Sequence, residues 1–293
     1  MTASFFHSFQ SGGDLISILL GLTSALSWGA ADFTGGLATR KIGAYRAVFF
    51  GEIVGILFIL PITLSVREPL PGFQSWIYAI LAGSLGTLGL LLLYYSLAEG
   101  TMSIAAPVSA LMAAILPVVV GSFTEGLPGF LTFLGFGFAL AAVWLVSQND
   151  TGLKDILSHL SSVRLPLLAG IGFGIYFVLM HVATRSSTFW PMVISRSSGL
   201  LVISLFLFFR RDSWRLSRNA WGIVAINGIL DVGGNAFFIL AGQTGRFDIA
   251  AVVSSLYPGA TVMLAAMILK ERISRTQWLG ITAALVAIIL FTL

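Results

Sequence analysis

The sequence predicts an all-α polytopic membrane protein with ten transmembrane helices, arranged as two inverted five-helix repeats. Three observations lead to this fold class. Apolar side chains make up 57% of the 293 residues and charged ones only 10%, whereas soluble domains carry roughly 25% charged residues. The apolar runs recur along the whole chain, and each is close to the roughly 20 residues that a membrane-spanning helix needs. Finally, the two halves of the sequence resemble each other.

Connectors rich in charge, glycine or proline set the ends of the predicted helices. The apolar segments between them cover residues 15–37, 48–66, 75–98, 101–123, 126–147, 165–183, 189–209, 220–241, 248–269 and 276–293. The longest connector, SQNDTGLKDILSHLSS at 147–162, has five segments on either side. We therefore expect a first repeat over 1–147, a polar connector over 148–164 and a second repeat over 165–293.

A shift of 145 positions aligns the two halves of the chain. It brings Ala-Thr-Arg at 38–40 onto 183–185 and Ile-Ala-Ala at 104–106 onto 249–251, and it aligns Trp76 with Trp221 and Gly83 with Gly228. A single shift that aligns triplets and tryptophans indicates an internal duplication. Because each copy has five helices, the second copy enters the membrane from the opposite side, which is the usual architecture of secondary transporters with a site near the membrane midplane.

Lysine and arginine are distributed unequally between the two faces. The face that holds both termini carries Arg67, Arg185 and Arg246, whereas the opposite face carries Arg40, Lys41, Lys154, Arg164, Arg210, Arg211, Arg215, Arg218, Lys270, Arg272 and Arg275. The positive-inside rule makes this basic face cytoplasmic and places the termini on the extracytoplasmic side. We expect a multi-pass protein of the inner or plasma membrane of a prokaryote.

Two carboxylates lie at similar depth in the first two predicted helices. Asp32, in SWGAADFTGG at 27–36, is about two turns from the basic end of its helix, and Glu52 is about as deep in the next. A carboxylate in hydrocarbon costs about 2.5–3.5 kcal/mol on insertion scales, so both should face the bundle interior or water. They could form a proton-coupling pair or a cation site, or each could bond separately to Arg46, Arg40 or the backbone.

The second repeat contains a polar stripe and an isolated arginine. Asn227, Asp231 and Asn235 recur every four residues along one side of the helix at 220–241, which indicates either a cavity wall or hydrogen-bonded helix packing. Arg196, in the helix before it, lies at a depth that favours an ion pair with Asp231. That pair could be a structural lock, or the arginine could bind a substrate carboxylate.

Prolines interrupt corresponding helices of the two copies. Pro258 lies in VSSLYPGAT at 253–261 among Ser254, Ser255 and Thr261; Pro107 and Pro117 flank Ser109 and Met112 in the helix at 101–123. Proline removes a backbone hydrogen bond, so broken helices in both copies would line a midplane site, although a packing kink is the alternative. Trp28, Tyr94, Tyr95, Tyr176 and Tyr257 are deep enough to line a pathway or to pack in the core, and His181 is expected to be an ordinary buried histidine.

The chain resembles the EamA family of the drug/metabolite transporter superfamily over essentially its whole length. The resemblance lies in the two five-helix repeats, in Trp28-Gly29, in Arg46 and Arg196 early in the second helix of each repeat, and in LKERISRTQWLG at 269–280. It implies secondary transport of small metabolites such as amino acids, often coupled to protons, with a central cavity walled by the first, third, fourth, sixth, eighth and ninth helices.

The leading hypothesis is therefore a secondary transporter that exports or exchanges a small polar or amphipathic solute, amino-acid-like or drug-like, by alternating access. Lipid scrambling or a structural role is the alternative, followed by an intramembrane enzyme, for which HExxH and GxSxG motifs are missing. We expect protons and membrane lipid as partners, and no nucleic acid, cofactor, metal or catalytic residue. The candidate substrate-binding residues are Trp28, Asp32, Tyr94, Ser109, Met112, Tyr176, Asn227, Asp231, Asn235, Ser254 and Tyr257, with Glu52, Arg46 and Arg196 as coupling or gating residues.

Overall fold

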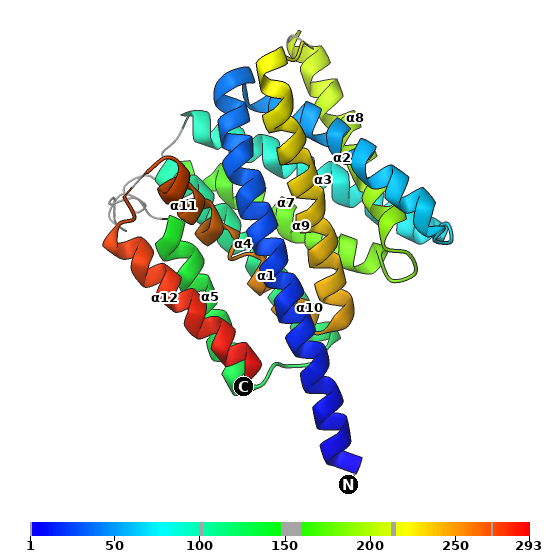
Figure 1. Ribbon diagram of the computed structural model, residues 1–293, viewed down its shortest axis with the longest axis vertical. Helices are drawn as coiled ribbons and strands as arrows, with labels where there is room; N and C mark the ends of the chain where they lie inside the picture. Colours follow the sequence, from blue (N-terminus) through cyan, green and yellow to red (C-terminus); the bar gives the residue numbers. More distant parts are fainter. Residues whose placement is uncertain (1, 100–101, 148–159, 212–214, 271) are drawn as a thin grey trace.

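The computed structural model describes the backbone of residues 2–99, 102–147, 160–211, 215–270 and 272–293, and the side chains of 15–93, 108–146, 164–211, 215–270 and 272–293. All regular elements in these ranges are helical. They are α1 (Thr2–Ile42), α2 (Ala44–Val66), α3 (Phe73–Glu99), α4 (Met102–Thr124), α5 (Phe130–Ser147), α7 (Leu160–Ala183), α8 (Phe189–Arg210), the 3-10 turn η1 (Arg218–Ala220), α9 (Trp221–Thr244), α10 (Phe247–Ser254), α11 (Tyr257–Ile268) and α12 (Arg275–Thr292) (Figure 1).

These elements form the ten predicted membrane helices, with α10 and α11 together as the ninth. Within the described residues, eight segments are long and apolar enough to cross a membrane, and α4 and α5 contribute the shorter apolar stretches Val108–Thr124 and Phe130–Val146. Large apolar side chains such as Phe123, Phe130 and Phe209 cover the outer surface, as expected of lipid-facing positions. Trp76, Trp221 and Trp278 are exposed near helix ends, where interfacial tryptophans are common.

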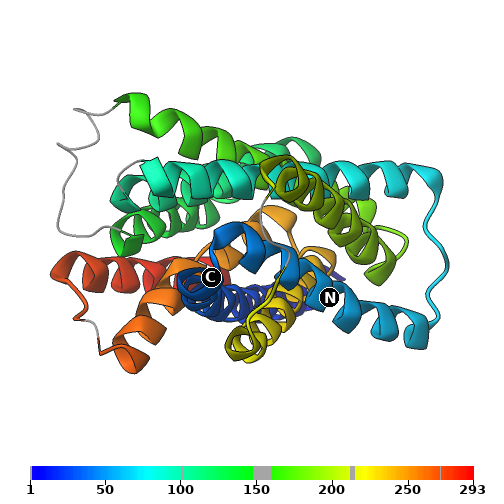
Figure 2. The same cartoon turned by 90° about the horizontal axis from the view of Figure 1, so that it is seen from above.

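The helices pack in a pattern that repeats between the two halves. The most extensive contacts join α1 to α9 and α3 to α7, and a shift of 145 positions converts the first pair into the second. Seen from above, α1 and α9 lie on one side of the molecule and α3 and α7 on the other (Figure 2). Each closely packed pair thus takes one helix from each repeat, so neither repeat could bury these faces alone.

The two equivalent helix pairs are held together by different contacts. On α1, Ser24 and Ser27 donate hydrogen bonds to the α9 carbonyls of Gly234 (2.8 Å) and Leu230 (2.7 Å). Gly172 of α7 replaces Ser27 in the second copy, and a methyl group placed there would lie 3.1 Å from the Leu85 carbonyl oxygen. The α1–α9 pair is therefore joined by side-chain hydrogen bonds, whereas at this equivalent point α3 and α7 are joined by close packing of small residues.

The ninth membrane helix is broken, as its proline predicts. α10 ends at Ser254 and α11 begins at Tyr257, with Pro258 in the first turn of α11. The proline ring has no N–H and excludes the carbonyl four residues earlier from its helical position. The expectation of a matching break in the fourth helix is wrong, because α4 is continuous through Pro107 and Pro117. Ala113 occupies the position equivalent to Pro258 and leaves the backbone ladder intact there.

Two equivalent glycines allow the repeats to approach closely. A methyl group on Gly228 of α9 would lie 2.8 Å from the Gly51 carbonyl oxygen of α2, and one on Gly83 of α3 would overlap the Ser195 carbonyl of α8. In both cases the contact is with backbone, which cannot move aside as a flexible side chain can. The Gly83 contact lies next to Arg196, so this close approach also sets the position of that arginine.

Replacing Gly83 with alanine is expected to destabilise the protein, because the new methyl group pushes α3 away from α8. We expect a loss of about 1–3 kcal/mol, typical of overpacking a close-packed interior. Gly137→Ala is the matched control, since nothing lies within 4 Å of a methyl group there and alanine favours a helix by up to about 1 kcal/mol over glycine. Thermal unfolding of the purified variants in detergent measures the change in stability that each substitution causes. Equal melting temperatures for the two variants would contradict the close contact.

Candidate functional site

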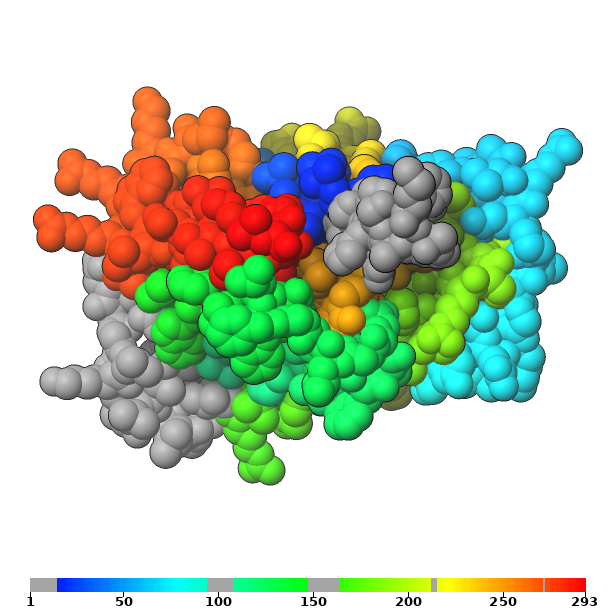
Figure 3. Space-filling view, turned by 90° about the horizontal axis from the view of Figure 1, so that it is seen from below, coloured from blue at the N-terminus to red at the C-terminus, as the bar shows by residue number. Residues whose placement is uncertain are grey.

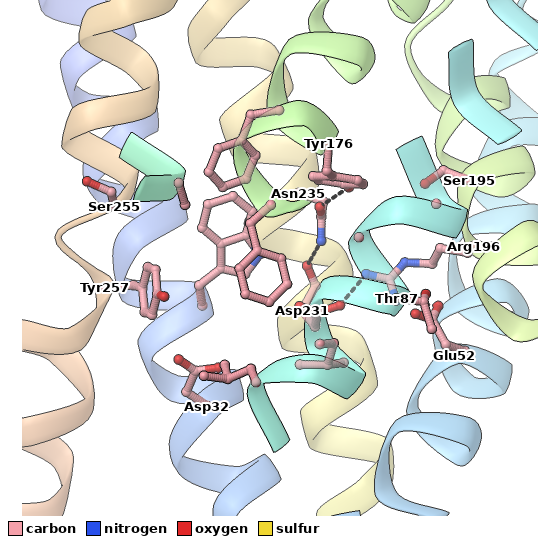
Figure 4. Close-up of a pocket in the computed structure, with 18 residues that line it drawn as sticks. Asp32, Glu52, Thr87, Tyr176, Ser195, Arg196, Asp231, Asn235, Ser255 and Tyr257 are labelled. Atoms are coloured by element: carbon pink, nitrogen blue, oxygen red, sulfur yellow. Dashed lines mark hydrogen bonds and ion pairs between the residues drawn. The ribbon is translucent and has the colours of Figure 1, made fainter. Parts of the chain in front are cut away.

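A cavity of about 220 Å³ lies between the two repeats. The first repeat lines it from α1, α2, α3 and α4, and the second from α7, α8, α9 and the break between α10 and α11 (Figure 4). Its lining residues are Trp28, Asp32, Glu52, Gly83, Gly86, Thr87, Leu90, Leu93, Ala113, Phe173, Tyr176, Phe177, Ser195, Arg196, Asp231, Asn235, Ser255 and Tyr257. The cavity therefore includes every helix that the family resemblance implied, together with α2 and α8.

Arg196 is the single cation among the residues that line this cavity, and two carboxylates bind it. Its Nη1 donates to Glu52 Oε2 at 3.0 Å and its Nη2 to Asp231 Oδ2. The predicted Arg196–Asp231 ion pair is thus confirmed, whereas Glu52 has a partner that the sequence did not indicate. Arg196 is 8% exposed, so its charge is tolerated because both neighbours neutralise it. Since Glu52 belongs to the first repeat and Arg196 to the second, this contact also joins the repeats.

Hydrogen bonds extend from this ion-pair cluster toward α7. The Asn235 amide nitrogen donates to the backbone carbonyl of Asp231 at 2.7 Å, and the Asn235 amide oxygen accepts a hydrogen bond from the Tyr176 hydroxyl. The carbonyl of Asp231 already belongs to the α9 ladder, so the asparagine fixes its own side chain against the helix. These contacts hold the Tyr176 ring at the cavity wall (Figure 4).

Gly234 leaves the space that the Trp28 side chain occupies, and Gly29 allows α1 to approach α11 closely. A methyl group on Gly234 of α9 would overlap the indole ring, and one on Gly29 would lie 2.7 Å from the Tyr257 carbonyl oxygen at the start of α11. The indole ring stacks on Phe177 with a centroid distance of 5.5 Å and meets Tyr257 edge-on at 6.3 Å. The break before α11 thus brings an aromatic side chain from each repeat to the same part of the cavity.

Asp32 differs from the other two acidic residues of the cavity. It is exposed at the cavity surface, and no hydrogen bond or ion pair joins its carboxylate to any residue whose side chain the structure describes. It lies near Tyr257 and well apart from Arg196, with Asp231 between them (Figure 4). Of the two alternatives that the sequence left open, the Asp32–Glu52 pair is therefore absent from these described contacts, and the cavity contains one carboxylate with no bound counter-charge.

Equivalent positions of the two repeats form the cavity, but their chemistry differs. Trp28 is equivalent to Phe173 and Asp32 to Phe177, while Asp231 is equivalent to Gly86 and Asn235 to Leu90. Among these eight positions, those on α1 and α9 include Asp32, Asp231 and Asn235. Those on α3 and α7 are all apolar. At these equivalent positions the duplicated scaffold therefore gives a polar wall on α1 and α9 and an apolar wall on α3 and α7, to which Thr87 and Tyr176 add hydroxyl groups.

The structure brings together most of the residues that the sequence singled out. The cavity contains Trp28, Asp32, Tyr176, Asp231, Asn235, Tyr257, Glu52 and Arg196. The other candidates lie elsewhere. Asn227 donates to the Ala31 carbonyl of α1 at 2.7 Å, and Ser254 is buried against Gly21. Ser109 and Met112 pack against Gly170, and Arg46 lies in the first turn of α2. Tyr94 falls outside the described side chains. The polar stripe of α9 thus serves both of its predicted roles, with Asn227 as a packing contact and its other two members in the cavity.

The sequence reasoning missed several lining residues, and a signal for some of them was present. Phe173, Phe177 and Gly86 are the repeat equivalents of Trp28, Asp32 and Asp231, so the 145-residue shift could have found them. Thr87, Ser195 and Ser255 had no such signal, because small hydroxyl residues are common at helix–helix contacts in membranes. Only the packing of α3 and α8 and the break before α11 place them at the cavity.

On the face that holds the termini, two glutamates of the first repeat cap helices of the second. Glu68 Oε2 accepts hydrogen bonds from the backbone N–H groups of Thr188 and Phe189, both at 2.9 Å, at the start of α8. Glu125 Oε2 accepts from the Phe247 N–H at 3.0 Å at the start of α10. Partial burial raises the pKa of the Glu125 carboxyl, and the bond from Phe247 opposes that rise. An acceptor carboxylate also interacts favourably with the positive end of the helix dipole.

These contacts lie on the face seen in Figure 3, where the orange start of α10 borders the green segment around the α4–α5 connection. Arg246 reinforces this border, because its Nη2 donates to the Gly126 carbonyl oxygen at 2.9 Å and to Asp248 Oδ2 at 2.7 Å. The two repeats are thus joined on this face by buried and half-buried polar contacts that would have to break if the repeats separated there.

The fold and the cavity define a class of protein: a multi-pass membrane protein whose repeats enclose a central cavity with ionisable, aromatic and apolar lining residues. Sequence comparison assigns the chain within that class. Residues 15–148 and 161–293 each match the EamA-like transporter family, and the chain belongs to that family. Membership of this family implies transport across a membrane rather than enzymatic activity.

Comparison with individual proteins adds partial sequence matches and a shared fold. An uncharacterized protein of Haemophilus influenzae is 32% identical over 165 residues, which is 54% of this chain and 53% of that protein, so the match spans about half of the relative's length. An uncharacterized protein of Methanocaldococcus jannaschii is 34% identical over 100 residues, 34% of this chain and 72% of that protein. One solved crystal structure shares the fold, with a TM-score of 0.74 at 16% identity over 94% of this chain and 95% of that one.

The ion-pair cluster predicts unequal costs for removing its members. Arg196→Met leaves two carboxylates without a cation, so we expect a loss of about 3–5 kcal/mol, the range for breaking a buried ion pair. Glu52→Gln should cost less, about 1–3 kcal/mol, because Asp231 still neutralises the arginine. Thermal unfolding in detergent measures both losses.

Arg218→Met is the matched control, because Arg218 is exposed at the basic face and surface substitutions change stability by about 0.5 kcal/mol or less. The double variant Arg196→Met/Glu52→Gln should be less destabilised than the sum of the single changes. Strict additivity would show that the two side chains are not coupled.

Proposed function

We propose that this protein is a secondary transporter that moves a small polar or amphipathic metabolite across the membrane by alternating access, in export or exchange. The cavity between the repeats is its substrate site, and protons are the coupling ion that its carboxylates can bind. The orientation follows the lysine and arginine distribution, with the basic face in the cytoplasm and the termini outside.

The observation that carries this proposal is the position of the cavity between two inverted copies. Side chains from both repeats line it, so a movement of one group of helices against another changes which face of the membrane the cavity meets. Its ionisable residues would be costly in contact with lipid, and intramembrane charged groups usually mark a substrate or ion pathway. A volume of about 220 Å³ is below the ~300–1,000 Å³ of pockets for drug-sized ligands, which favours a small solute.

The contacts between repeats suggest which parts move. The glutamate caps at α8 and α10 close the face that holds the termini in this conformation. They involve few atoms and lie near the surface, so they can break without exposing the apolar core. The serine contacts between α1 and α9 are in the membrane, where a broken hydrogen bond finds no water. We infer that α1 and α9 move as one unit and that the caps release when the cavity opens toward the terminal face.

Solute counterflow in proteoliposomes tests the proposed function. Liposomes that contain the purified protein are loaded with a panel of unlabelled amines, amino acids, sugars and nucleosides, and uptake of each labelled counterpart is measured. We expect saturable counterflow of at least one solute. Asp231→Asn and Asp32→Asn should each lower it by about tenfold or more, equivalent to roughly 1.4 kcal/mol of lost interaction.

Counterflow is compared at equal amounts of correctly folded protein, judged by gel filtration in detergent. Labelled phospholipid in the same liposomes tests the alternative function. Rapid exchange of lipid between leaflets without solute counterflow would indicate that the protein scrambles lipid and does not transport a solute. If both aspartate variants transport at the wild-type rate, the assignment of the cavity as substrate site is wrong.

The absence of cysteine allows the predicted opening to be measured. Leu90, which lines the cavity and is partly exposed, is replaced by cysteine in this cysteine-free chain. We expect a membrane-impermeant thiol reagent to label it slowly from the terminal face, and Glu68→Ala to increase that rate by about threefold or more, since removing two or three hydrogen bonds of about 1 kcal/mol favours the open form.

Labelling is measured in right-side-out and inverted membrane vesicles, so that each face is tested separately. Ser65→Ala on the same segment is the control, because its hydroxyl bonds only within α2. Equal labelling rates in Glu68→Ala and in the protein with intact Glu68 would show that this cap does not close the cavity.

A further inference from the structure

We infer that the cavity binds an amphipathic organic cation, with the ammonium group at Asp32 and the apolar body against the wall formed by α3 and α7. This inference rests on the proposed transport function and narrows its substrate class. It follows from three features of the described residues: the balance of charge in the cavity, the aromatic side chains beside Asp32, and the different chemistry of the two walls.

The charge balance of the cavity favours a cation. Three carboxylates and one guanidinium line it. Two of the carboxylates bind Arg196, so that guanidinium already has the acidic partners that a substrate carboxylate would have to displace. An anion would therefore compete with two fixed charges and would meet a surplus of negative charge. A cation meets an acceptor in Asp32 that no described side chain occupies.

Aromatic rings lie beside this carboxylate. Trp28 is one helical turn from Asp32 on α1, and Tyr257 contacts the indole ring edge-on with the centroids 6.3 Å apart. Both residues line the cavity with Asp32, and Tyr257 lies on the same side of the cavity as Asp32 in Figure 4. An ammonium group with a carboxylate on one side and the face of a tryptophan or tyrosine on another is stabilised by both, and cation–π contacts are stronger where water is excluded.

The wall formed by α3 and α7 has no polar group at the equivalent positions. Its hydroxyl groups are those of Thr87 and of Tyr176, and the Tyr176 hydroxyl already donates to Asn235. Gly86, Leu90, Phe173 and Phe177 occupy the places that Asp231, Asn235, Trp28 and Asp32 hold on the polar wall. A ligand that spans the cavity would therefore have a charged end at α1 and an apolar end at α3 and α7. Sugars and other solutes that are polar all round would leave hydroxyl groups against hydrocarbon, which costs free energy without compensating hydrogen bonds. The asymmetry thus selects amphipathic amines.

Equilibrium binding to the purified protein tests this inference with probes that share a phenethyl group and differ in charge. The probes are phenethylammonium, 3-phenylpropanoate and 3-phenylpropanamide, measured by isothermal titration calorimetry in detergent at pH 7. We expect phenethylammonium to bind at least tenfold more tightly than the other two. Ethylammonium, which keeps the charge but has no ring, should bind at least tenfold more weakly than phenethylammonium.

Variants identify the groups responsible. Asp32→Asn should abolish the preference for phenethylammonium over 3-phenylpropanamide, whereas Asp32→Glu, which keeps the charge, should retain it. Leu90→Ala should reduce the advantage of phenethylammonium over ethylammonium without changing the preference for positive charge. Gel filtration and thermal unfolding show that each variant is folded, and only folded variants are compared.

Several outcomes would overturn the inference. These are equal affinity for the three probes, no binding of phenethylammonium, or a charge preference that survives in Asp32→Asn. The counterflow experiment separates this failure from failure of the proposed function. Counterflow of amino acids, sugars or nucleosides but not of amines would support the proposed transport function and contradict an organic cation as the substrate. The absence of counterflow for every solute would contradict the proposed transport function itself.

Discussion

The buried guanidinium of Arg196 is the constraint on which the centre of this protein depends. A permanent cation in a low-dielectric interior must be neutralised, and the chain does this with one carboxylate from each repeat. The consequence is geometric as well as electrostatic. α2, α8 and α9 must converge at one depth, and the glycines at 83 and 228 allow their backbones and that of α3 to come close enough. The cavity forms where these helices and their partners on the other side meet.

Neutralising the arginine also decides what remains available to a ligand. Glu52 and Asp231 are engaged, and the hydrogen bonds of Asn235 fix Tyr176 beside them. Asp32, on the other side of Asp231, is left as the acceptor with no described partner. Under the proposed function, such a site separates the charges that hold the repeats together from the charge that would recognise a solute. That separation matters in a transporter, because binding must be reversible while the fold stays intact.

The duplication gives the scaffold its symmetry, and divergence of the two copies gives the cavity its asymmetric lining. Equivalent helices pack in equivalent pairs, but α1 and α9 are tied by serine hydroxyl groups, while α3 and α7 contact each other through glycines. The same divergence placed carboxylates on one wall and phenylalanines on the other. A single ancestral surface has thus become both a polar and an apolar wall, which a symmetric assembly of two identical copies could not provide.

The sequence by itself determined the membrane class, the ten helices, the duplication and the break at Pro258, because each depends on local composition, on proline geometry or on a repeat visible in the linear order. Asp231 and Arg196 were predicted to pair since helix depth can be counted along the chain. Only the tertiary structure decided that Glu52 binds Arg196, that Asp32 has no described partner, and that Asn227, Ser109 and Ser254 lie outside the cavity. Those outcomes depend on how each helix is rotated about its axis, and rotation is set by packing against neighbours far away in the sequence.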